Sequence, residues 1–448
     1  MKKNSETGLT VFVASGCLIG ALYFRSPVTF AMALVTGIIS WAITKLPYEP
    51  REKTFLVRIF AVSVLSRLAI CLLIYFESIL RGGEGSVFDD DVLWPRAAWI
   101  LFRSWTGGQA FAAWNAGNDP ALNSGEYYLR CIAALYSVFG YYSPLIAKYF
   151  NIIQGSLVAL MVYGIARTVS GRPVARLSAV LTAFHPSLVL WSVVSLKDMS
   201  CIFLLLLSVW LFYRYLNGGK RWSVAFPLIP LAALFTVRPF IAVIGASALA
   251  TAYLVSLERP VKIAAAVLGG YIVLLLALMP GPGVKTAVER GMQDVNMSKL
   301  LRYHREYVRT GGNIYRILPA GSYRVNTVEF GFPEILIVEA KGVFYLLSVP
   351  FPWAAMNWFQ LISSPQMLWW YLVLFFSIAG VCSISGDRFR LFSPIILVGA
   401  SLILAMAIFE GNIGTAARHR DVITPYVILF ASIGMVNFLY GHGKNITG

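Results

Sequence analysis

Residues 391–409 read LFSPIILVGASLILAMAIF, an uncharged stretch long enough to cross the hydrocarbon core of a membrane as a helix. Similar stretches recur along the whole chain of 448 residues, which is 58% hydrophobic and only 13% charged. Soluble domains carry about 25% charged residues. Because a backbone in lipid must satisfy its own hydrogen bonds, and because these stretches lack the alternation of barrel strands, each predicts a helix. The sequence therefore predicts an all-α, polytopic membrane protein.

The chain has about twelve apolar stretches that approach spanning length. They lie at residues 8–24, 27–45, 55–79, 144–166, 174–194, 199–214, 222–237, 240–257, 263–280, 366–386, 391–409 and 422–440. Basic residues gather in alternate short loops, which places those loops and the amino terminus in the cytoplasm. This bias also explains the net charge of +16 without a nucleic-acid partner. Two long segments, 80–143 and 281–341, then fall on the outer side.

Residues 343–363 form one ambiguous apolar segment. Pro350 and Pro352 interrupt its helix, so we interpret it as a re-entrant or interfacial element. That choice places residues 410–421 outside and the carboxyl terminus in the cytoplasm. The predicted parts are two additional N-terminal spans (1–54), a transmembrane core (55–280) with its first outer loop (80–143), an outer cap with the re-entrant element (281–365), and C-terminal spans with a cytoplasmic tail (366–448).

Three consecutive carboxylates, Asp89, Asp90 and Asp91, follow a predicted span. They open an amphipathic stretch in which the apolar residues Trp94, Ala98, Leu101 and Trp105 recur at helical spacing. This pattern predicts a helix lying in the membrane interface. Carboxylates at this depth can act as a general base or bind a divalent cation. They can also stabilise the first turn of the helix, but one aspartate suffices for a cap. The run of three therefore favours a functional site.

Further charged residues lie at the other outer turns. Lys197 and Asp198 stand between two spans, where they form a structural pair or cap, or supply a phosphate-binding lysine and a second acidic group. Arg238 precedes Pro239 at the next outer turn and either binds phosphate or extends toward water.

The last basic cluster comprises Arg418, His419 and Arg420. On the outer side it breaks the positive-inside trend, and an anionic lipid phosphate or diphosphate would explain it. The alternative is a different topology in which this loop is cytoplasmic.

Several motifs occur in an order that resembles the GT-C superfamily of membrane glycosyltransferases, over about residues 55–440. An acidic pair followed by an aromatic residue comes first, as Asp90, Asp91 and Trp94. The later motifs are EYYLRCIAALYSVFGYYSPLIAKYFNII (126–153), PSLVLWSVVSLKD (186–198), SVPFPWAAMNWFQL (348–361) and NIGTAARHRDVITPY (412–426). The chain looks most similar to bacterial relatives of the protein-mannosyl and aminoarabinose transferases. It departs from them in having three aspartates where two acidic residues are usual, and two extra spans at its start.

The resemblance implies a polyprenyl-phosphate-linked sugar donor, membrane lipids as surroundings, and a glycan, lipid or protein acceptor. It implies an inverting displacement in which Asp90 is the base, while Asp89 or Asp91 supports it or helps to hold a divalent metal ion as a cofactor. Asp198 would be the second acidic group. The donor phosphate would face Lys197, Arg238, Arg418, His419 and Arg420. The implied location is the bacterial inner membrane, with the active site on its outer, periplasmic face.

Two other functions fit parts of the pattern. A surface-polysaccharide polymerase or ligase acting on polyprenyl diphosphate would depend on Arg418 and His419 rather than on an acidic run. A transporter or flippase for lipid-linked sugars would place its charges near mid-membrane, whereas here most lie at the ends of spans. Arg58 and Arg67, both within one span, are the main exceptions and can extend to the interface or pair with a neighbour.

Overall fold

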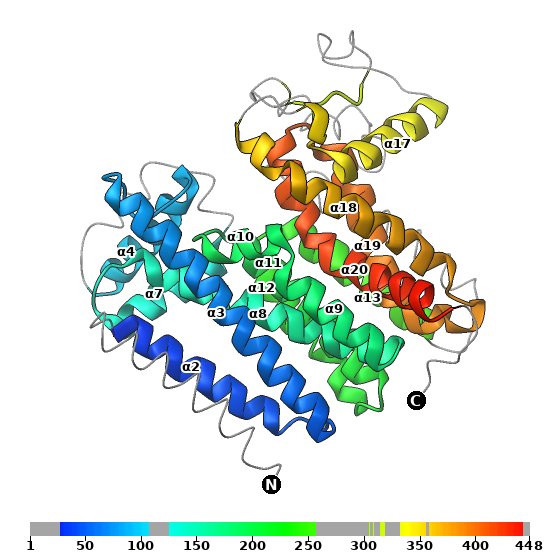
Figure 1. Ribbon diagram of the computed structural model, residues 1–448, viewed down its shortest axis with the longest axis horizontal. Helices are drawn as coiled ribbons and strands as arrows, with labels where there is room; N and C mark the ends of the chain where they lie inside the picture. The colour runs from blue at the N-terminus through cyan, green and yellow to red at the C-terminus, as the bar shows by residue number, and fades with distance from the viewer. Residues whose placement is uncertain are drawn as a thin grey trace, which may run out of the picture. The chain divides into compact units, whose positions relative to one another are not determined.

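The computed structural model describes residues 27–106, 125–256, 304, 308, 314–318, 332–354 and 358–441. Helices account for the regular structure of these residues, which contain no strand beyond one isolated bridge between Ile314 and Asn412 (Figure 1). The prediction of an all-α protein is therefore confirmed.

Eight helices within the described ranges are long and apolar enough to cross a membrane. They are α2 (Pro27–Thr44), α3 (Pro50–Leu80), α8 (Pro144–Val169), α11 (Asp198–Leu216), α13 (Pro239–Ser256), α18 (Trp358–Cys382), α19 (Phe389–Phe409) and α20 (Ile413–Tyr440). A bent pair, α9 (Arg172–Phe184) and α10 (Pro186–Val193), makes nine if it is one span. The expected spans 8–24 and 263–280 lie outside the described residues, so the count of about twelve stays a prediction.

The expected span at 222–237 is divided in the structure. A 3-10 turn, η1 (Arg221–Ala225), precedes the short helix α12 (Leu228–Phe235). Pro227 between them has no backbone N–H and so does not extend a continuous helix. The apolar segment is too short to pass as a straight span on its own.

The chain forms two compact units, which we describe separately. The first comprises Met1–Ile165, Arg176–Leu207 and Thr236–Arg238; the second comprises Ala166–Ala175, Ser208–Phe235 and Pro239–Gly448. In the first unit α2 and α10 pack on α3, while α4 (Asp89–Trp105) packs on α7 (Glu126–Phe139). The predicted amphipathic helix is thus present as α4, whose place in the membrane interface stays a prediction.

Arg67 of α3 lies fully buried where the bent pair changes direction by 51°. Its Nη1 donates to the carbonyl of Ala183 at the end of α9 (2.7 Å), and its Nε donates to Ser192 Oγ of α10 (2.9 Å). The guanidinium therefore satisfies a carbonyl at the end of one helix and holds both halves of the bend, instead of extending to the interface. The bend falls at His185–Pro186, where the proline has no backbone N–H to continue the hydrogen bonding of α9.

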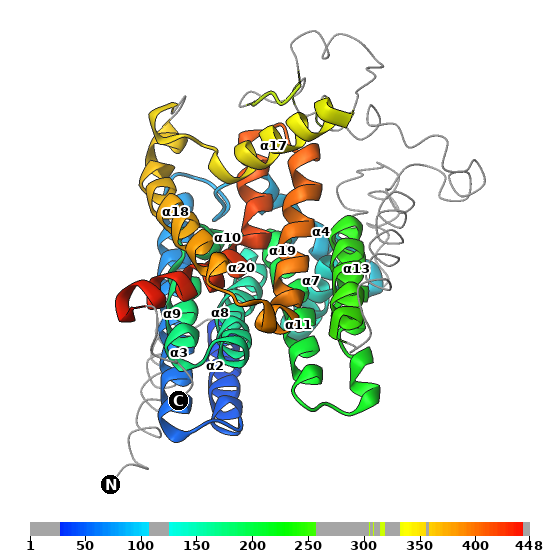
Figure 2. The same cartoon turned by 90° about the vertical axis from the view of Figure 1, so that its right-hand side faces the viewer.

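In the second unit α20 packs closely on α18 and more lightly on α19, while α13 and α17 (Phe332–Ser348) pack on α19 (Figure 2). Two glycines allow the backbones of α18 and α20 to touch. A Cβ at Gly380 would meet the carbonyl of Phe430, and one at Gly434 would meet the carbonyl of Phe376. Small residues of this kind permit close approach of helices within a membrane.

The ambiguous segment 343–363 contains the end of α17, a short turn η4 (Pro352–Ala354) and the start of α18. Pro350 and Pro352 lie between the two helices, so the predicted interruption is confirmed. Its re-entrant or interfacial placement, and the four predicted parts of the chain, stay predictions.

Candidate functional site

The three aspartates occupy the first turn of α4, but their side chains have different surroundings. Successive helical residues point about 100° apart. Asp91 is therefore directed into the first unit and is fully buried, whereas Asp89 and Asp90 are exposed. The run of three combines one buried anchor with two carboxylates on the accessible side.

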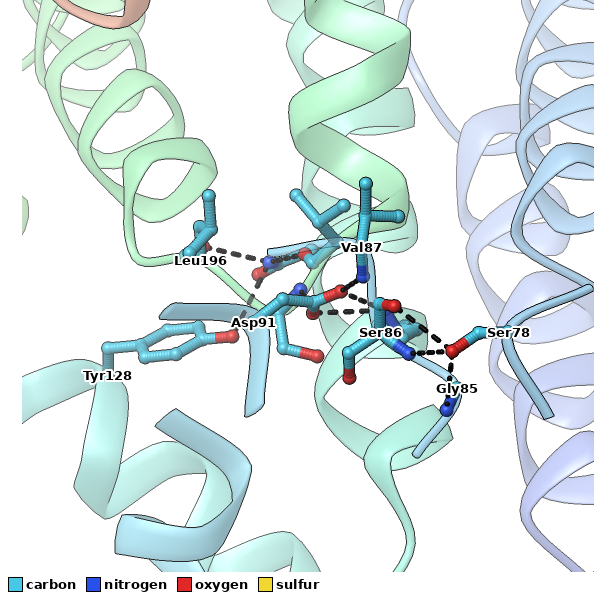
Figure 3. Close-up of polar contacts among 11 residues, drawn as sticks. Ser78, Gly85, Ser86, Val87, Asp91, Tyr128 and Leu196 are labelled. Atoms are coloured by element: carbon cyan, nitrogen blue, oxygen red, sulfur yellow. Dashed lines mark hydrogen bonds and ion pairs between the residues drawn. The ribbon is translucent and has the colours of Figure 1, made fainter. Parts of the chain in front are cut away.

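Asp91 accepts four hydrogen bonds, several of which Figure 3 shows. The Nζ of Lys148, also fully buried, lies 2.9 Å from Oδ1 and 2.7 Å from Oδ2. The backbone N–H of Val87 donates to Oδ2 (3.0 Å) and that of Ser195 donates to Oδ1 (2.6 Å). A buried charge is tolerated when it is paired and hydrogen-bonded in this way. Asp91 thus joins the start of α4, the start of α8 and the loop after α10.

The turn that leads into α4 is ordered by one hydroxyl. Ser78 Oγ accepts from the backbone N–H groups of Gly85 and Ser86, each at 3.1 Å, and donates to the carbonyl of Ser86 (Figure 3). Gly85 has a φ of 79°, which glycine adopts without strain. The acidic run therefore begins from a defined turn.

The loop after α10 is held from a second side by Asn151. Its Nδ2 donates to the carbonyls of Val194 (2.7 Å) and Leu196 (2.9 Å), and it lies 3.4 Å from the hydroxyl of Tyr128 (Figure 3). Burial, with the nearby charge of Asp91, raises the pKa of Tyr128 well above its ordinary value, so its phenol stays neutral. Asp91 and Asn151 together hold the backbone of residues 194–196 in place, and this loop leads directly into Lys197 and Asp198.

Asp198 opens α11 and forms an ion pair with Arg238, whose Nη2 lies 2.6 Å from Oδ1. Asp198 is buried, while the side chain of Arg238 is 16% exposed. The backbone N–H of Glu126, at the start of α7, donates to the carbonyl of Thr236 (3.2 Å), close in sequence to Arg238. Lys197 places its Nζ 4.8 Å from the ring centroid of Trp94.

These contacts bring most of the predicted site residues together within the first unit. Asp91 contacts the backbone of Ser195, two residues before Lys197, and Asp198 contacts Arg238. The sequence did not indicate Lys148 as part of this group. Lys148 lies within an apolar span, and a charge there requires a partner, so its position in the sequence could have indicated a buried ion pair.

Arg418, His419 and Arg420 lie in the second unit, near the start of α20. Arg420 is buried, donates from Nη1 to the carbonyl of Val349 (2.6 Å) and lies 5.2 Å from the ring centroid of Trp370. His419 Nδ1 contacts the buried carboxylate of Glu410, and Arg418 is the most exposed of the three. Their role at a donor phosphate stays a prediction.

The donor set does not favour a metal site at the aspartates. Among the residues that the structure describes, no group of three or more His, Cys, Asp or Glu side chains is arranged to hold a metal ion. Both oxygens of Asp91 already accept hydrogen bonds from Lys148 and from backbone N–H groups. Asp91 is therefore not suited to bind an ion, and Asp89 and Asp90 are the other two carboxylates of the run. We therefore derive no step that requires a metal.

Comparison with known proteins places this cluster in a family context. The family model of dolichyl-phosphate-mannose-protein mannosyltransferases matches residues 128–281, about a third of the chain. The match includes Lys148, Lys197, Asp198 and Arg238 and begins after the aspartate run. A search of curated proteins found no match. Over residues 128–281 the chain is similar to this family, and this match together with the apolar helices supports a membrane glycosyltransferase of the GT-C type.

Proposed function

We propose that this glycosyltransferase takes its sugar from a polyprenyl-phosphate donor and transfers it to a glycan, lipid or protein acceptor at the outer, periplasmic face of a bacterial inner membrane. The family match supports the kind of donor, because the family's name specifies a sugar carried on dolichyl phosphate. The observation that carries the proposal is the group of acidic and basic side chains that direct contacts gather in the first unit.

Asp90 is the proposed general base. Asp91 is enclosed by Lys148 and two backbone donors, whereas Asp90 is exposed one residue earlier on the same helix. The acceptor oxygen bonds to the anomeric carbon while its proton moves to the Asp90 carboxylate. The bond from the anomeric carbon to the phosphate oxygen breaks, and polyprenyl phosphate leaves with the bonding electrons. A single displacement of this kind inverts the anomeric configuration.

Lys197 and Arg238 are the proposed phosphate-binding residues. Both are cations near the start of α11, and positive groups placed where charge develops on a leaving group lower the barrier to its departure. Asp198 contacts Nη2 of Arg238 and so helps to fix the direction of a planar group that carries five N–H donors. We therefore assign Asp198 an orienting role toward Arg238.

Comparative mass spectrometry of envelope glycans, lipids and glycoproteins tests this function. Cells from which the gene has been removed should lack one sugar on one acceptor, and the wild-type gene should restore it. D90N should not restore it, because loss of a general base lowers the rate by about 10²–10⁴-fold. D89N, a change at a neighbouring exposed aspartate, should restore it.

Two outcomes would contradict the proposal. An unchanged envelope in the deleted cells would argue against the transfer itself. Full restoration by D90N would argue against Asp90 as the base. If D90N restored the sugar and D89N did not, the base would be Asp89 instead.

A further inference from the structure

The buried face of α4 meets the loop after α10 at two points. Asp91 accepts from the backbone N–H of Ser195 at 2.6 Å, and Trp94, one turn later, lies under the ammonium of Lys197 at 4.8 Å. Asp91 is fully buried and Trp94 is 4% exposed. Residues three apart on a helix share a face, so the two contacts act together. They hold the loop that carries Lys197 against the helix that carries Asp90.

The indole of Trp94 fits into a space that Gly125 leaves open. A Cβ at Gly125 would lie 2.5 Å and 2.6 Å from two indole carbons and 3.5 Å from Cδ of Lys197. On another side the ring packs edge-on against Tyr128, with centroids 6.0 Å apart. Any side chain at position 125 would therefore displace the ring, and with it the surface on which the lysine rests.

A ring beneath Lys197 has a physical consequence for anion binding. The lysine side chain is long and flexible, and fixing it on a ligand normally costs rotamer entropy. Attraction between an ammonium and the negative face of an indole holds the side chain before a ligand arrives. An ammonium has three N–H donors, so contact with a ring face is compatible with donation to an oxygen acceptor.

We propose that Trp94, seated against Gly125, is a positioning residue that holds Lys197 ready for the phosphate of the lipid-linked donor. This inference rests on the proposed function, in which Lys197 binds that phosphate. It assigns to Trp94 an effect on donor affinity that acts through Lys197.

Equilibrium binding of farnesyl phosphate to the full-length protein in detergent tests the inference without a known sugar or acceptor. K197A should weaken binding about tenfold or more, as loss of a charge-assisted contact. W94L should weaken it about threefold to thirtyfold, the range of cation–π energies, and W94F should weaken it less. The double variant W94L/K197A should bind no more weakly than K197A, because one effect passes through the other.

Two further variants separate positioning from general packing. G125A leaves every polar group in place and should reproduce the loss seen in W94L. W99L is the matched control on the same helix, since Trp99 packs on Tyr136 with centroids 5.4 Å apart. Its affinity should stay within about twofold of the wild type, below the cation–π range.

Multiplicative losses in W94L/K197A, or unchanged or tighter binding by W94L and W94F, would overturn the inference. Wild-type affinity in K197A would overturn the phosphate role of Lys197 together with it. A failure of Asp90 as the base would appear in turnover and not in this binding assay, so the two proposals fail separately.

Discussion

The ion pair between Lys148 and Asp91 offers the sharpest test of the architecture around the site. Its two side chains have no solvent exposure, and the Nζ lies 2.7 Å from the nearer carboxylate oxygen. K148M removes the cation and keeps an apolar side chain of similar length. The variant leaves a buried carboxylate that still contacts the loop after α10 but has lost its partner on α8.

The expected loss follows from the geometry. Breaking a buried pair from one side costs about 3–5 kcal/mol, because the remaining charge stays out of water without its partner. Asp91 keeps the backbone donors of Val87 and Ser195 in K148M, which places the loss near the lower end, at about 3 kcal/mol. The pair between Arg130 and Glu126 provides the control, because its side chains are 63% and 54% exposed. R130M should lower the free energy of unfolding by less than about 1 kcal/mol.

Thermal unfolding of the purified proteins in one detergent measures the difference. K148M should unfold about 5 °C or more below the wild type and R130M within about 2 °C of it. The double variant D91N/K148M should be more stable than the sum of its single changes predicts, because it leaves no unpaired charge. If K148M and R130M unfolded at the same temperature, the pair would not be buried as described.

Three further predictions follow from other parts of the fold. Burial raises the pKa of Glu339 in α17 from 4.5 to about 7, so the folded protein holds this proton longer than the unfolded chain does. The free energy of unfolding should then fall as pH rises from about 4.5 to 7, and E339Q should flatten that fall in melts at pH 5 and pH 8. R67M should lower the free energy of unfolding by about 2–4 kcal/mol, since it removes the contacts to Ala183 and Ser192. A melting temperature equal to that of the wild type would contradict this prediction. G434L should prevent a monodisperse elution profile in detergent, because its side chain would overlap the backbone of α18, whereas normal elution would argue against the close approach.

Much of the helical architecture could be predicted from hydropathy alone, since long apolar stretches in lipid have few alternatives to helices. The kink at His185–Pro186 and the interruption at Pro350 and Pro352 could be predicted as well, because proline acts locally. The division of residues 222–237 depends on the chain around Pro227, and average hydropathy does not reveal it.

The sequence indicated which charged residues of the first unit lie near one another, but not the different surroundings of each. Three adjacent aspartates look equivalent in sequence, and only the rotation of α4 determines that Asp91 turns inward while Asp90 stays accessible. Partners across the fold, such as Lys148 for Asp91 and Arg238 for Asp198, lie far apart in the chain. No local spacing rule connects such residues, so their pairing required the tertiary structure.

Combined turnover and binding measurements on Asp90 test the central claim most directly. Purified wild-type protein, D90N and D89N would be compared for release of polyprenyl phosphate from the lipid-linked sugar, with the acceptor, that the envelope comparison identifies, and for affinity toward farnesyl phosphate. We predict that D90N releases the carrier at least about 100-fold more slowly, with unchanged affinity, and that D89N resembles the wild type. Wild-type release by D90N, or equal losses of release and affinity, would contradict a base that acts on the acceptor.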